Sequence, residues 1–255
     1  MLKDRLGNGE LVFGTMLKQV CNNSFSKILE LAGFDYTVVD MEHGTYSIRE
    51  TAGILQHLWN TSVTGIVRIP KLQYHFVARA IDVGAKGVWV PHVDTPEEAR
   101  DLVKFAKHPP DGQRGAAVPY FRKKQFRECG DGANYLEEVN DEILLIVQIE
   151  SDKAVGNIDE ILSVDGIDVA MMGCADLSLD VGQPWLRQHS EVKKRIHKVL
   201  TSCQEHGIYF GNHLSNLEEL KYWIDQGMQM VTYSNEVSML TKEAQRALSE
   251  LKVTE

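Results

Sequence analysis

The sequence predicts an eight-stranded parallel β/α barrel, the (β/α)8 TIM barrel, formed by a single domain over residues 1–255. Short apolar runs alternate with amphipathic segments along the whole chain. The apolar runs are nearly continuous, as expected for parallel strands that are covered on both faces. No low-complexity tract or linker divides the chain, and its length is typical of one such barrel.

The expected strands are runs rich in Val, Ile, Leu and aromatic residues, which favour extended backbone. In chain order they are LVFGTM (11–16), YTVVD (36–40), TGIVRI (64–69), GVWVP (87–91), ILLIVQIE (143–150), DVAMMG (168–173), IYFGN (208–212) and MVTYS (230–234). An open nucleotide-binding sheet would need a glycine-rich turn after the first strand, and GTMLKQV is not one.

The expected helices follow the strands, and their apolar residues recur three and four positions apart. They are residues 24–32, 47–59, 74–82, 95–107, 152–162, 191–206, 216–226 and 236–251. Ser24 and Thr95 stand at N-cap positions, and Pro96 occupies the first helical position after Thr95. Glycines typical of the residue after a helix end follow four of these segments: Gly33, Gly84, Gly207 and Gly227.

One connection does not fit the regular alternation. Residues 108–134, between the fourth helix and the fifth strand, form a long segment rich in proline, glycine and charge. A connection of this length in a compact domain is usually a lid, a binding loop or an interface element, and we expect one of these.

Composition narrows the class of protein. The net charge of −9 argues against nucleic acid as a partner. No run is long enough to span a membrane, and the first ten residues lack the apolar core of a signal peptide. The four cysteines, Cys21, Cys129, Cys174 and Cys203, form no CxxC pair, which is typical of reduced thiols. We therefore expect a cytoplasmic protein.

Charged and polar residues gather where the expected strands end. In a barrel of this kind the active site lies at the carboxyl ends of the strands, so these side chains should converge. They are Asp40, Glu42, His43, Arg68, His92, Gln148, Glu150 and Asp176.

Glu150 and Asp176 suggest a cation site. Two carboxylates about 4 Å apart repel by roughly 4 kcal/mol in a protein-like dielectric, unless a proton or a cation joins them. A hard divalent ion held by few protein oxygens fits this pair better than tetrahedral zinc, which needs more His or Cys. Two simpler roles stay open: Glu150 could pair with a lysine, and Asp176 could cap a helix.

Six motifs in order carry a family resemblance: VVDMEHG, IVRIP, DVGAKGVWVPHVDTPEEA, PPDGQRG, VQIES and GCADLS. Together they resemble the HpcH/HpaI aldolases over residues 11–185. The resemblance implies a metal-dependent enzyme that cleaves a 4-hydroxy-2-oxo acid or a 2-keto-3-deoxy sugar acid to pyruvate and an aldehyde, with Mg²⁺, Mn²⁺ or Co²⁺ as cofactor. It also implies a homohexamer in which the last helix, 236–251, is exchanged between subunits.

The same resemblance implies roles for single residues. Glu150 and Asp176 would bind the metal, and Arg68 would face the 2-oxygen of pyruvate. His43 would be the catalytic histidine, with Asp40 assisting it. Backbone amides after Gly173, at Ala175 and Asp176, would hold the pyruvate carboxylate, and Gln148 would lie just behind them.

Asp82 matches the acid that pairs with the catalytic histidine in the family. It ends a helix, however, so it should lie on the opposite face of its own barrel. It would then act across a subunit contact, or it is simply a charge at a helix end.

Some residues depart from the family pattern. Cys174 replaces a proline, which alters the turn before Asp176; a buried, unreactive thiol is the more common outcome for such a cysteine. The eighth strand ends in the polar run Tyr233 to Glu236, and Arg122, Lys123, Lys124 and Arg127 lie in the long connection. These departures leave the identity of the aldehyde open.

Three other functions remain open. Lys18 or Lys71 could form a Schiff base with the substrate in a metal-independent aldolase. The same metal site could serve an oxaloacetate decarboxylase, or a lyase of malyl- or citramalyl-type thioesters. A barrel that acts only as a binding scaffold is the weakest alternative, because a scaffold has no need of converging charges.

Overall fold

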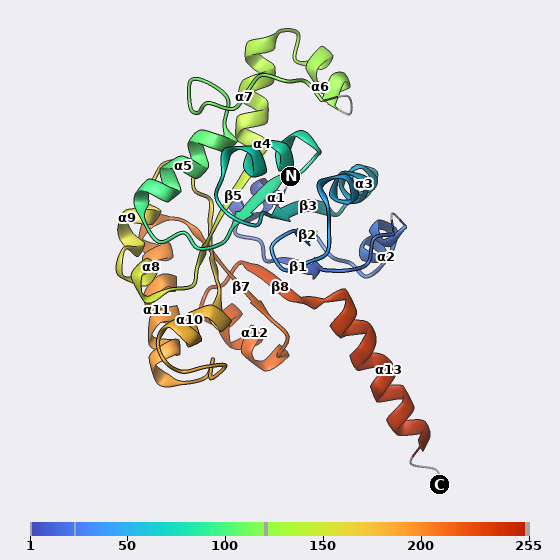
Figure 1. The fold of residues 1–255 in the computed structure, drawn as a ribbon, viewed down its shortest axis with the longest axis vertical. Coiled ribbons are helices and arrows are strands. Elements are labelled where there is room, and N and C mark those ends of the chain that lie inside the picture. Colours follow the sequence, from blue (N-terminus) through green and yellow to red (C-terminus); the bar gives the residue numbers. More distant parts are fainter. Residues whose placement is uncertain (1, 23, 120–121, 253–255) are drawn as a thin grey trace.

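The computed structural model describes residues 2–22, 24–119 and 122–252. Eight parallel strands form a closed barrel in sequence order, and helices surround it (Figure 1). The strands are β1 (Val12–Leu17), β2 (Tyr36–Asp40), β3 (Thr64–Arg68), β4 (Gly87–Val90), β5 (Leu144–Ile149), β6 (Val169–Met172), β7 (Tyr209–Leu214) and β8 (Met230–Asn235). The barrel closes where β1 pairs with β8, with Val12 opposite Met230. The predicted fold and all eight predicted strands are confirmed.

Most of the predicted helices are confirmed as well. The helices are α1 (Leu2–Gly7), α2 (Phe25–Leu31), α3 (Ile48–Leu58), α4 (Tyr74–Asp82), α5 (Pro96–Ala106), α6 (Lys123–Glu128), α7 (Gly132–Glu142), α8 (Asp152–Gly156), α9 (Ile158–Leu162), α10 (Cys174–Asp180), α11 (Ser190–His206), α12 (Leu217–Asp225) and α13 (Glu236–Lys252). The predicted helix 152–162 is two short helices that meet at Asn157. The sequence did not predict α1, α6, α7 or α10.

The two predicted N-caps have different outcomes. Thr95 has extended backbone and forms a capping box with Glu98, and Pro96 follows at the first helical position, as predicted. Ser24 is wrong as a cap, because its backbone is already helical and its side chain makes no capping hydrogen bond. The four predicted glycines all have a positive φ, the conformation in which a residue with a Cβ is disfavoured.

The long connection is not a continuous loop. Within the part that the structure describes, residues 108–134 include all of α6 and the beginning of α7. These two helices project from the barrel beyond α4 (Figure 1). Phe126 of α6 packs edge-on against Tyr135 of α7, and Arg122 pairs with Glu142 at 2.9 Å. The prediction of a loop was wrong because prolines and glycines at its start hid the helical pattern that follows.

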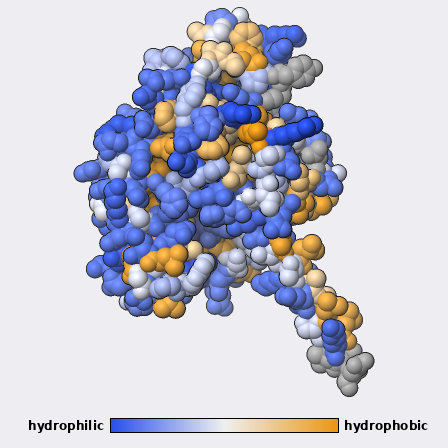
Figure 2. Space-filling model, in the orientation of Figure 1, coloured by the Kyte–Doolittle hydropathy of each residue, from blue (hydrophilic) through white to orange (hydrophobic). Residues whose placement is uncertain are grey.

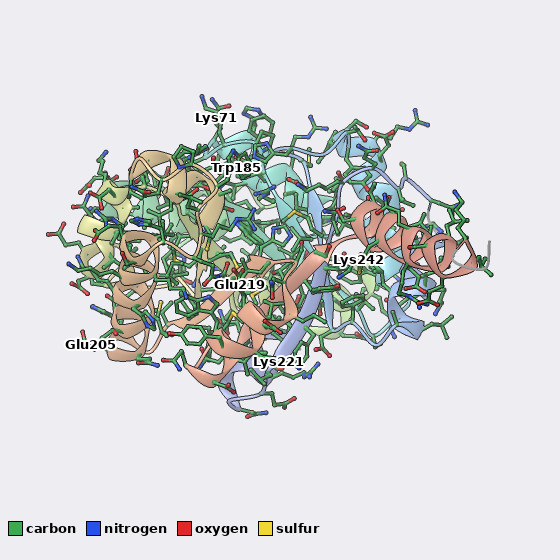
Figure 3. All side chains as sticks on the ribbon, turned by 90° about the horizontal axis from the view of Figure 1, so that it is seen from below. Lys71, Trp185, Glu205, Glu219, Lys221 and Lys242 are labelled. Atoms are coloured by element: carbon green, nitrogen blue, oxygen red, sulfur yellow. The ribbon has the colours of Figure 1, made fainter. Side chains whose placement is uncertain are left out.

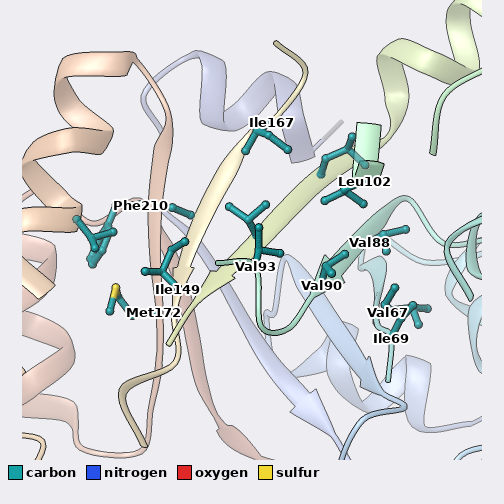
Figure 4. Packing of buried hydrophobic residues seen from close by; sticks show 14 of the residues in the cluster. Val67, Ile69, Val88, Val90, Val93, Leu102, Ile149, Ile167, Met172 and Phe210 are labelled. Carbon is teal, nitrogen blue, oxygen red and sulfur yellow. The ribbon is translucent and has the colours of Figure 1, made fainter. Parts of the chain in front are cut away.

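Side chains on each strand alternate between two cores. An inner core fills the barrel, with Val38, Ile66 and Ile146 among its residues. An outer core packs strands against helices, with Val67, Val88 and Ile149 among its residues (Figure 4). Because side chains two positions apart share a face, Asp40, Arg68 and Gln148 point inward beyond Val38, Ile66 and Ile146. This alternation brings the polar strand ends into one mouth.

The surface shows one unusual projection. Helix α13 extends away from the barrel and carries apolar side chains along its length (Figure 2). Leu240 and Leu251 are each 72% exposed, and Leu248 is 52% exposed. None of the helices in the described part of the chain has the length and apolar character needed to cross a membrane.

Candidate active site

A cavity of about 340 Å³ opens at the carboxyl ends of the strands. Six of the residues predicted from the sequence line it: His43, Arg68, Gln148, Gly173, Ala175 and Asp176. Lys18 and Trp89 also line this cavity. The structure therefore brings together residues that are far apart in the sequence, from β2 to the first turn of α10.

Arg68 is the centre of the site, and strand register places its partners. Asp40 stands opposite Arg68 in the β2–β3 pairing, and Trp89 stands opposite Arg68 in the β3–β4 pairing. The guanidinium donates from Nε to Asp40 Oδ1 at 2.9 Å and from Nη2 to Asp40 Oδ2 at 2.7 Å. Burial alone would raise the pKa of Asp40, but the hydrogen bonds and charge of Arg68 hold it below its usual range.

Two further acids surround this pair. Glu42 Oε2 lies 3.1 Å from Nη1 of Arg68, and the other oxygen of Glu42 lies 3.6 Å from Nε2 of His92. Glu150 Oε1 accepts a hydrogen bond from the backbone N–H of His92 at 2.7 Å and lies 2.9 Å from His92 Nδ1. Burial raises the pKa of both Glu42 and Glu150, as expected for carboxylates that share a poorly hydrated site.

Gln148 links the acids to the arginine. Its amide nitrogen donates to Glu150 Oε2, and its amide oxygen accepts from Trp89 Nε1 and, at 3.5 Å, from Arg68. Asp176 lies in the first turn of α10, and its negative charge contributes to the raised pKa of Glu42. Asp40 and Glu42 thus lie against Arg68, and Glu150 lies against His92 behind them, while Asp176 lines the cavity itself.

The donors present fit a hard divalent ion. A Cβ at position 173 would lie 2.4 Å from Glu150 Oε2, so glycine leaves open the space in front of that carboxylate. Carboxylate oxygens suit Mg²⁺ and Mn²⁺, which usually keep water or substrate in their remaining positions. Within the described residues, no group of three or more His, Cys, Asp and Glu side chains is arranged to hold a metal. Glu150 and Asp176 offer two carboxylates, fewer than such a group needs, so water and substrate would have to supply the other ligands.

Asp82 lies apart from the other predicted residues. It ends α4, directly before the amino end of β4, and its side chain pairs with Arg114 at 3.1 Å. Burial raises the pKa of Asp82, although the charge of Arg114 opposes this. Within one chain, Asp82 therefore has a structural partner and does not line the cavity with His43.

Comparison with known proteins places the chain in a family. The family model for HpcH/HpaI aldolase/citrate lyase matches residues 18–242. This chain belongs to that family.

Individual relatives agree with the family assignment. The chain is 33% identical over 221 residues to a hydroxypyruvate/pyruvate aldolase of Deinococcus radiodurans, a match that covers 87% of this chain and 79% of the relative. It is 34% identical over 194 residues to a 2-keto-3-deoxy-L-rhamnonate aldolase of Escherichia coli K12, covering 76% and 71% of the two chains.

A crystal structure gives the same result for the fold. An HpcH/HpaI aldolase from Desulfitobacterium hafniense superimposes with a TM-score of 0.92 at 34% identity, covering 99% of this chain and 96% of that one. The protein is accordingly a carbon–carbon lyase with a single-domain (β/α)8 barrel.

The lysines considered for a Schiff base differ in position. Lys18 lines the cavity of this aldolase-family chain, and its Nζ lies 3.8 Å from Asp40 Oδ2. Lys71 is exposed and does not line the cavity; Figure 3 labels it at the edge of the molecule. Lys18 is therefore the only one of the two that could meet a substrate in this cavity.

Cys174 is buried at the start of α10. Its thiol donates to Asn212 Oδ1 at 3.4 Å, and burial raises its pKa to about 11. A thiol with this pKa is protonated near neutral pH and is a weak nucleophile. The expectation of a buried, unreactive cysteine agrees with this environment.

Sequence reasoning assigned no role to several residues of the site. Glu42 and His92 stand at predicted strand ends, but only the structure shows that Glu42 meets Arg68 and that His92 meets Glu150. Trp89 could have been found, because the period-2 pattern of β4 points it inward. Trp185 and Arg187 lie in an irregular loop after α10, and no periodic signal marks them.

Proposed function

We propose that this protein is a divalent-metal-dependent aldolase that cleaves a 4-hydroxy-2-oxo acid or a 2-keto-3-deoxy sugar acid to pyruvate and an aldehyde. The observation that carries the proposal is the buried Arg68 guanidinium, surrounded by carboxylates at the mouth of the barrel. Two relatives support it by their names, a hydroxypyruvate/pyruvate aldolase and a 2-keto-3-deoxy-L-rhamnonate aldolase, and the second name is that of a 2-keto-3-deoxy sugar acid.

Glu150 and Asp176 would hold the ion, which when bound supplies Lewis acidity to the 2-oxo group of the substrate. Arg68 would donate hydrogen bonds to the 2-oxygen as negative charge develops there. A guanidinium suits this task because it stays protonated and its position is set before the reaction by Asp40 and Trp89. The amides of Ala175 and Asp176, in the first turn of α10, would hold the carboxylate of pyruvate.

His43 would accept the proton of the 4-hydroxyl group during cleavage. Its side chain is 58% exposed at the cavity, so it can reach a substrate that enters from solvent. Its backbone N–H donates to Asp40 Oδ1 at 3.2 Å, which fixes the turn that carries it. An imidazole exchanges protons readily near neutral pH.

We also propose that the protein is a cytoplasmic homohexamer in which α13 is exchanged between subunits. All four cysteines are free, which is consistent with a reducing compartment. In such an assembly, Asp82 of one subunit would support His43 of another. The exposed leucines of α13 support the exchange, because a second subunit would remove them from water.

A panel of assays tests this function. Pyruvate and Mn²⁺ are incubated with succinic semialdehyde, tartronate semialdehyde, glycolaldehyde or lactaldehyde, and condensation is followed by chromatography. We expect condensation with at least one aldehyde, loss of activity with EDTA, and recovery when Mn²⁺ is restored. Borohydride should not trap a covalent adduct with pyruvate.

The alternatives predict other results. Activity that survives EDTA, with borohydride labelling of Lys18, would establish a Schiff-base aldolase. Decarboxylation of oxaloacetate or cleavage of a malyl thioester, without any aldehyde condensation, would assign the metal site to one of those reactions. A protein that binds neither metal, pyruvate nor oxalate would be a scaffold.

A further inference from the structure

The active-site cavity continues into a second, larger space. A groove of about 840 Å³ runs between the loop after α10, the start of α12 and helix α13. Trp185, Arg187 and Ser215 line both this groove and the active-site cavity. Figure 3 labels Trp185, Glu219 and Lys242, which line the groove from these three elements. A substrate that occupies the cavity therefore has a path along which its far end can extend.

Arg187 is an available cation at this junction. It is half-buried, and within the described residues its side chain makes no hydrogen bond and no ion pair. Glu219, an acid in the groove, is engaged by the side-chain amide of Gln188 and forms no ion pair with Arg187. A guanidinium on the wall of a cavity, with its donors free, is well suited to bind a carboxylate or a phosphate.

The loop that carries Arg187 is anchored to the active-site helix. Trp185 has a left-handed backbone, with φ of 62°. The residue is 68% exposed. Its amide donates to Ser178 Oγ at 3.1 Å, and the Ser178 hydroxyl donates to the carbonyl of Ala175. Left-handed backbone in a bulky residue is unfavourable, and such residues cluster at active sites and ligand-binding loops. These bonds tie the backbone of Trp185, two residues before Arg187, to Ala175.

We propose that Arg187 determines substrate specificity by binding a negatively charged group at the far end of the aldehyde, while Trp185 covers the carbon chain. This inference rests on the proposed function, in which Arg68 and the metal ligands take the pyruvate portion. Arg68 and Arg187 would then recognise opposite ends of the substrate that is cleaved. The preferred acceptor is an anionic aldehyde, with either a carboxylate or a phosphate as its charged group.

The test compares Arg187→Gln with Lys194→Gln. Lys194 is an exposed residue of α11 that lines neither the groove nor the active-site cavity. Its variant therefore makes the same change in net charge away from both. Each protein is assayed with pyruvate and Mn²⁺ against succinic semialdehyde, glyceraldehyde 3-phosphate and the uncharged butanal. Circular dichroism confirms that each variant is folded.

We expect Arg187→Gln to lower kcat/KM for the anionic aldehydes by about 10- to 100-fold, mainly through KM, as for loss of one charge-assisted interaction. Butanal should be used within about twofold of the wild-type rate, and Lys194→Gln should match wild type for all three. Arg187→Lys should recover part of the loss. A loss confined to succinic semialdehyde or to glyceraldehyde 3-phosphate identifies the carboxylate or the phosphate as the ligand.

A separate measurement distinguishes the two proposals. Exchange of the pyruvate methyl protons with deuterated water, followed by NMR without any aldehyde, reports on the pyruvate portion of the site alone. If wild-type protein neither exchanges these protons nor condenses any aldehyde, the proposed function fails. If wild type is active, but Arg187→Gln affects charged and uncharged aldehydes equally or leaves both unchanged, the role of Arg187 is disproved.

Discussion

At the scale of single residues, Arg68 carries the largest consequence. The guanidinium is buried and meets Asp40 through two hydrogen bonds and Glu42 through an ion pair. If it stabilises charge on the substrate, Arg68→Ala should lower kcat by about 10²–10³, as for removal of one oxyanion donor. Steady-state kinetics at saturating Mn²⁺ measure this, and near wild-type turnover would refute the assignment.

Removal of Arg68 also leaves Asp40 buried without its main partner, so folding must be checked separately. Arg68→Lys keeps a positive charge but loses the two-pronged geometry. We expect this variant to fold with nearly normal thermal stability and still to have reduced kcat. If only the alanine variant lost activity, charge rather than geometry would be the essential property of Arg68.

Gly173 provides a second test at this scale. A methyl group at this position would lie 2.4 Å from Glu150 Oε2 and 2.5 Å from Glu150 Cβ, so Gly173→Ala must displace that side chain. We expect Mn²⁺ affinity, measured by isothermal titration calorimetry, to fall by at least about tenfold. Gly182→Ala serves as a control, since a Cβ there meets no atom within 4 Å, although its positive φ of 70° disfavours alanine. Unchanged Mn²⁺ affinity in Gly173→Ala would contradict Glu150 as a ligand.

At the scale of secondary-structure elements, local signals decide where helices begin. Thr95 Oγ1 accepts from the backbone N–H of Glu98 at 3.3 Å, and Glu98 Oε2 accepts from that of Thr95 at 3.0 Å. Thr95→Ala should lower the free energy of unfolding by about 1 kcal/mol, as typical for loss of an N-cap. Ser24→Ala is a matched control, because Ser24 makes no capping bond and its loss should cost almost nothing. Urea denaturation of both variants measures the difference, and equal effects would argue against the cap at Thr95.

The connection between α5 and β5 shows where local signals fail. His108 is fully buried there, its Nδ1 bonds to the carbonyl of Arg114, and its backbone N–H donates to Asn140. Helix α7 thus packs against a segment that reads as an irregular loop from its sequence. Burial of a histidine in a proline-rich segment is decided by the helix that covers it, not by its neighbours in sequence.

At the scale of the whole molecule, His108 predicts a pH dependence of stability. Burial lowers its pKa to about 4, whereas in the unfolded chain the value returns to about 6.5. Between these two values the unfolded chain binds more protons, so the free energy of unfolding falls as the pH is lowered from 6.5 to 4. The part of this fall in the free energy of unfolding that comes from His108 is about 3 kcal/mol at most. Urea denaturation of wild type and His108→Asn across this range tests it, and the variant should show a shallower fall. Parallel curves would contradict the buried neutral histidine.

The exposed face of α13 predicts an assembly. Leu240 and Leu251 are each 72% exposed, and we expect a second subunit to cover them in the proposed assembly. Light scattering should give the mass of a hexamer for wild type and a smaller species for Leu240→Glu with Leu251→Glu. Gln245→Glu, a charge added at an exposed polar residue of the same helix, should leave the mass unchanged. A wild-type monomer would disprove the exchanged helix.

The sequence by itself determined the eight strands, most of the helices and the set of polar residues at the strand ends. It could do so because these features depend on local periods: two residues for a strand, between three and four for a helix. Only the tertiary structure decided which of those residues meet.

The pairing of Asp40 with Arg68 depends on strand register, and the places of Glu42 and His92 depend on turns that bring separate strand ends together. Arg187 reaches the cavity through an irregular loop, and Ser24 lost its expected role because its backbone is already helical. Contacts between distant segments are set by packing, and no short stretch of sequence contains that information.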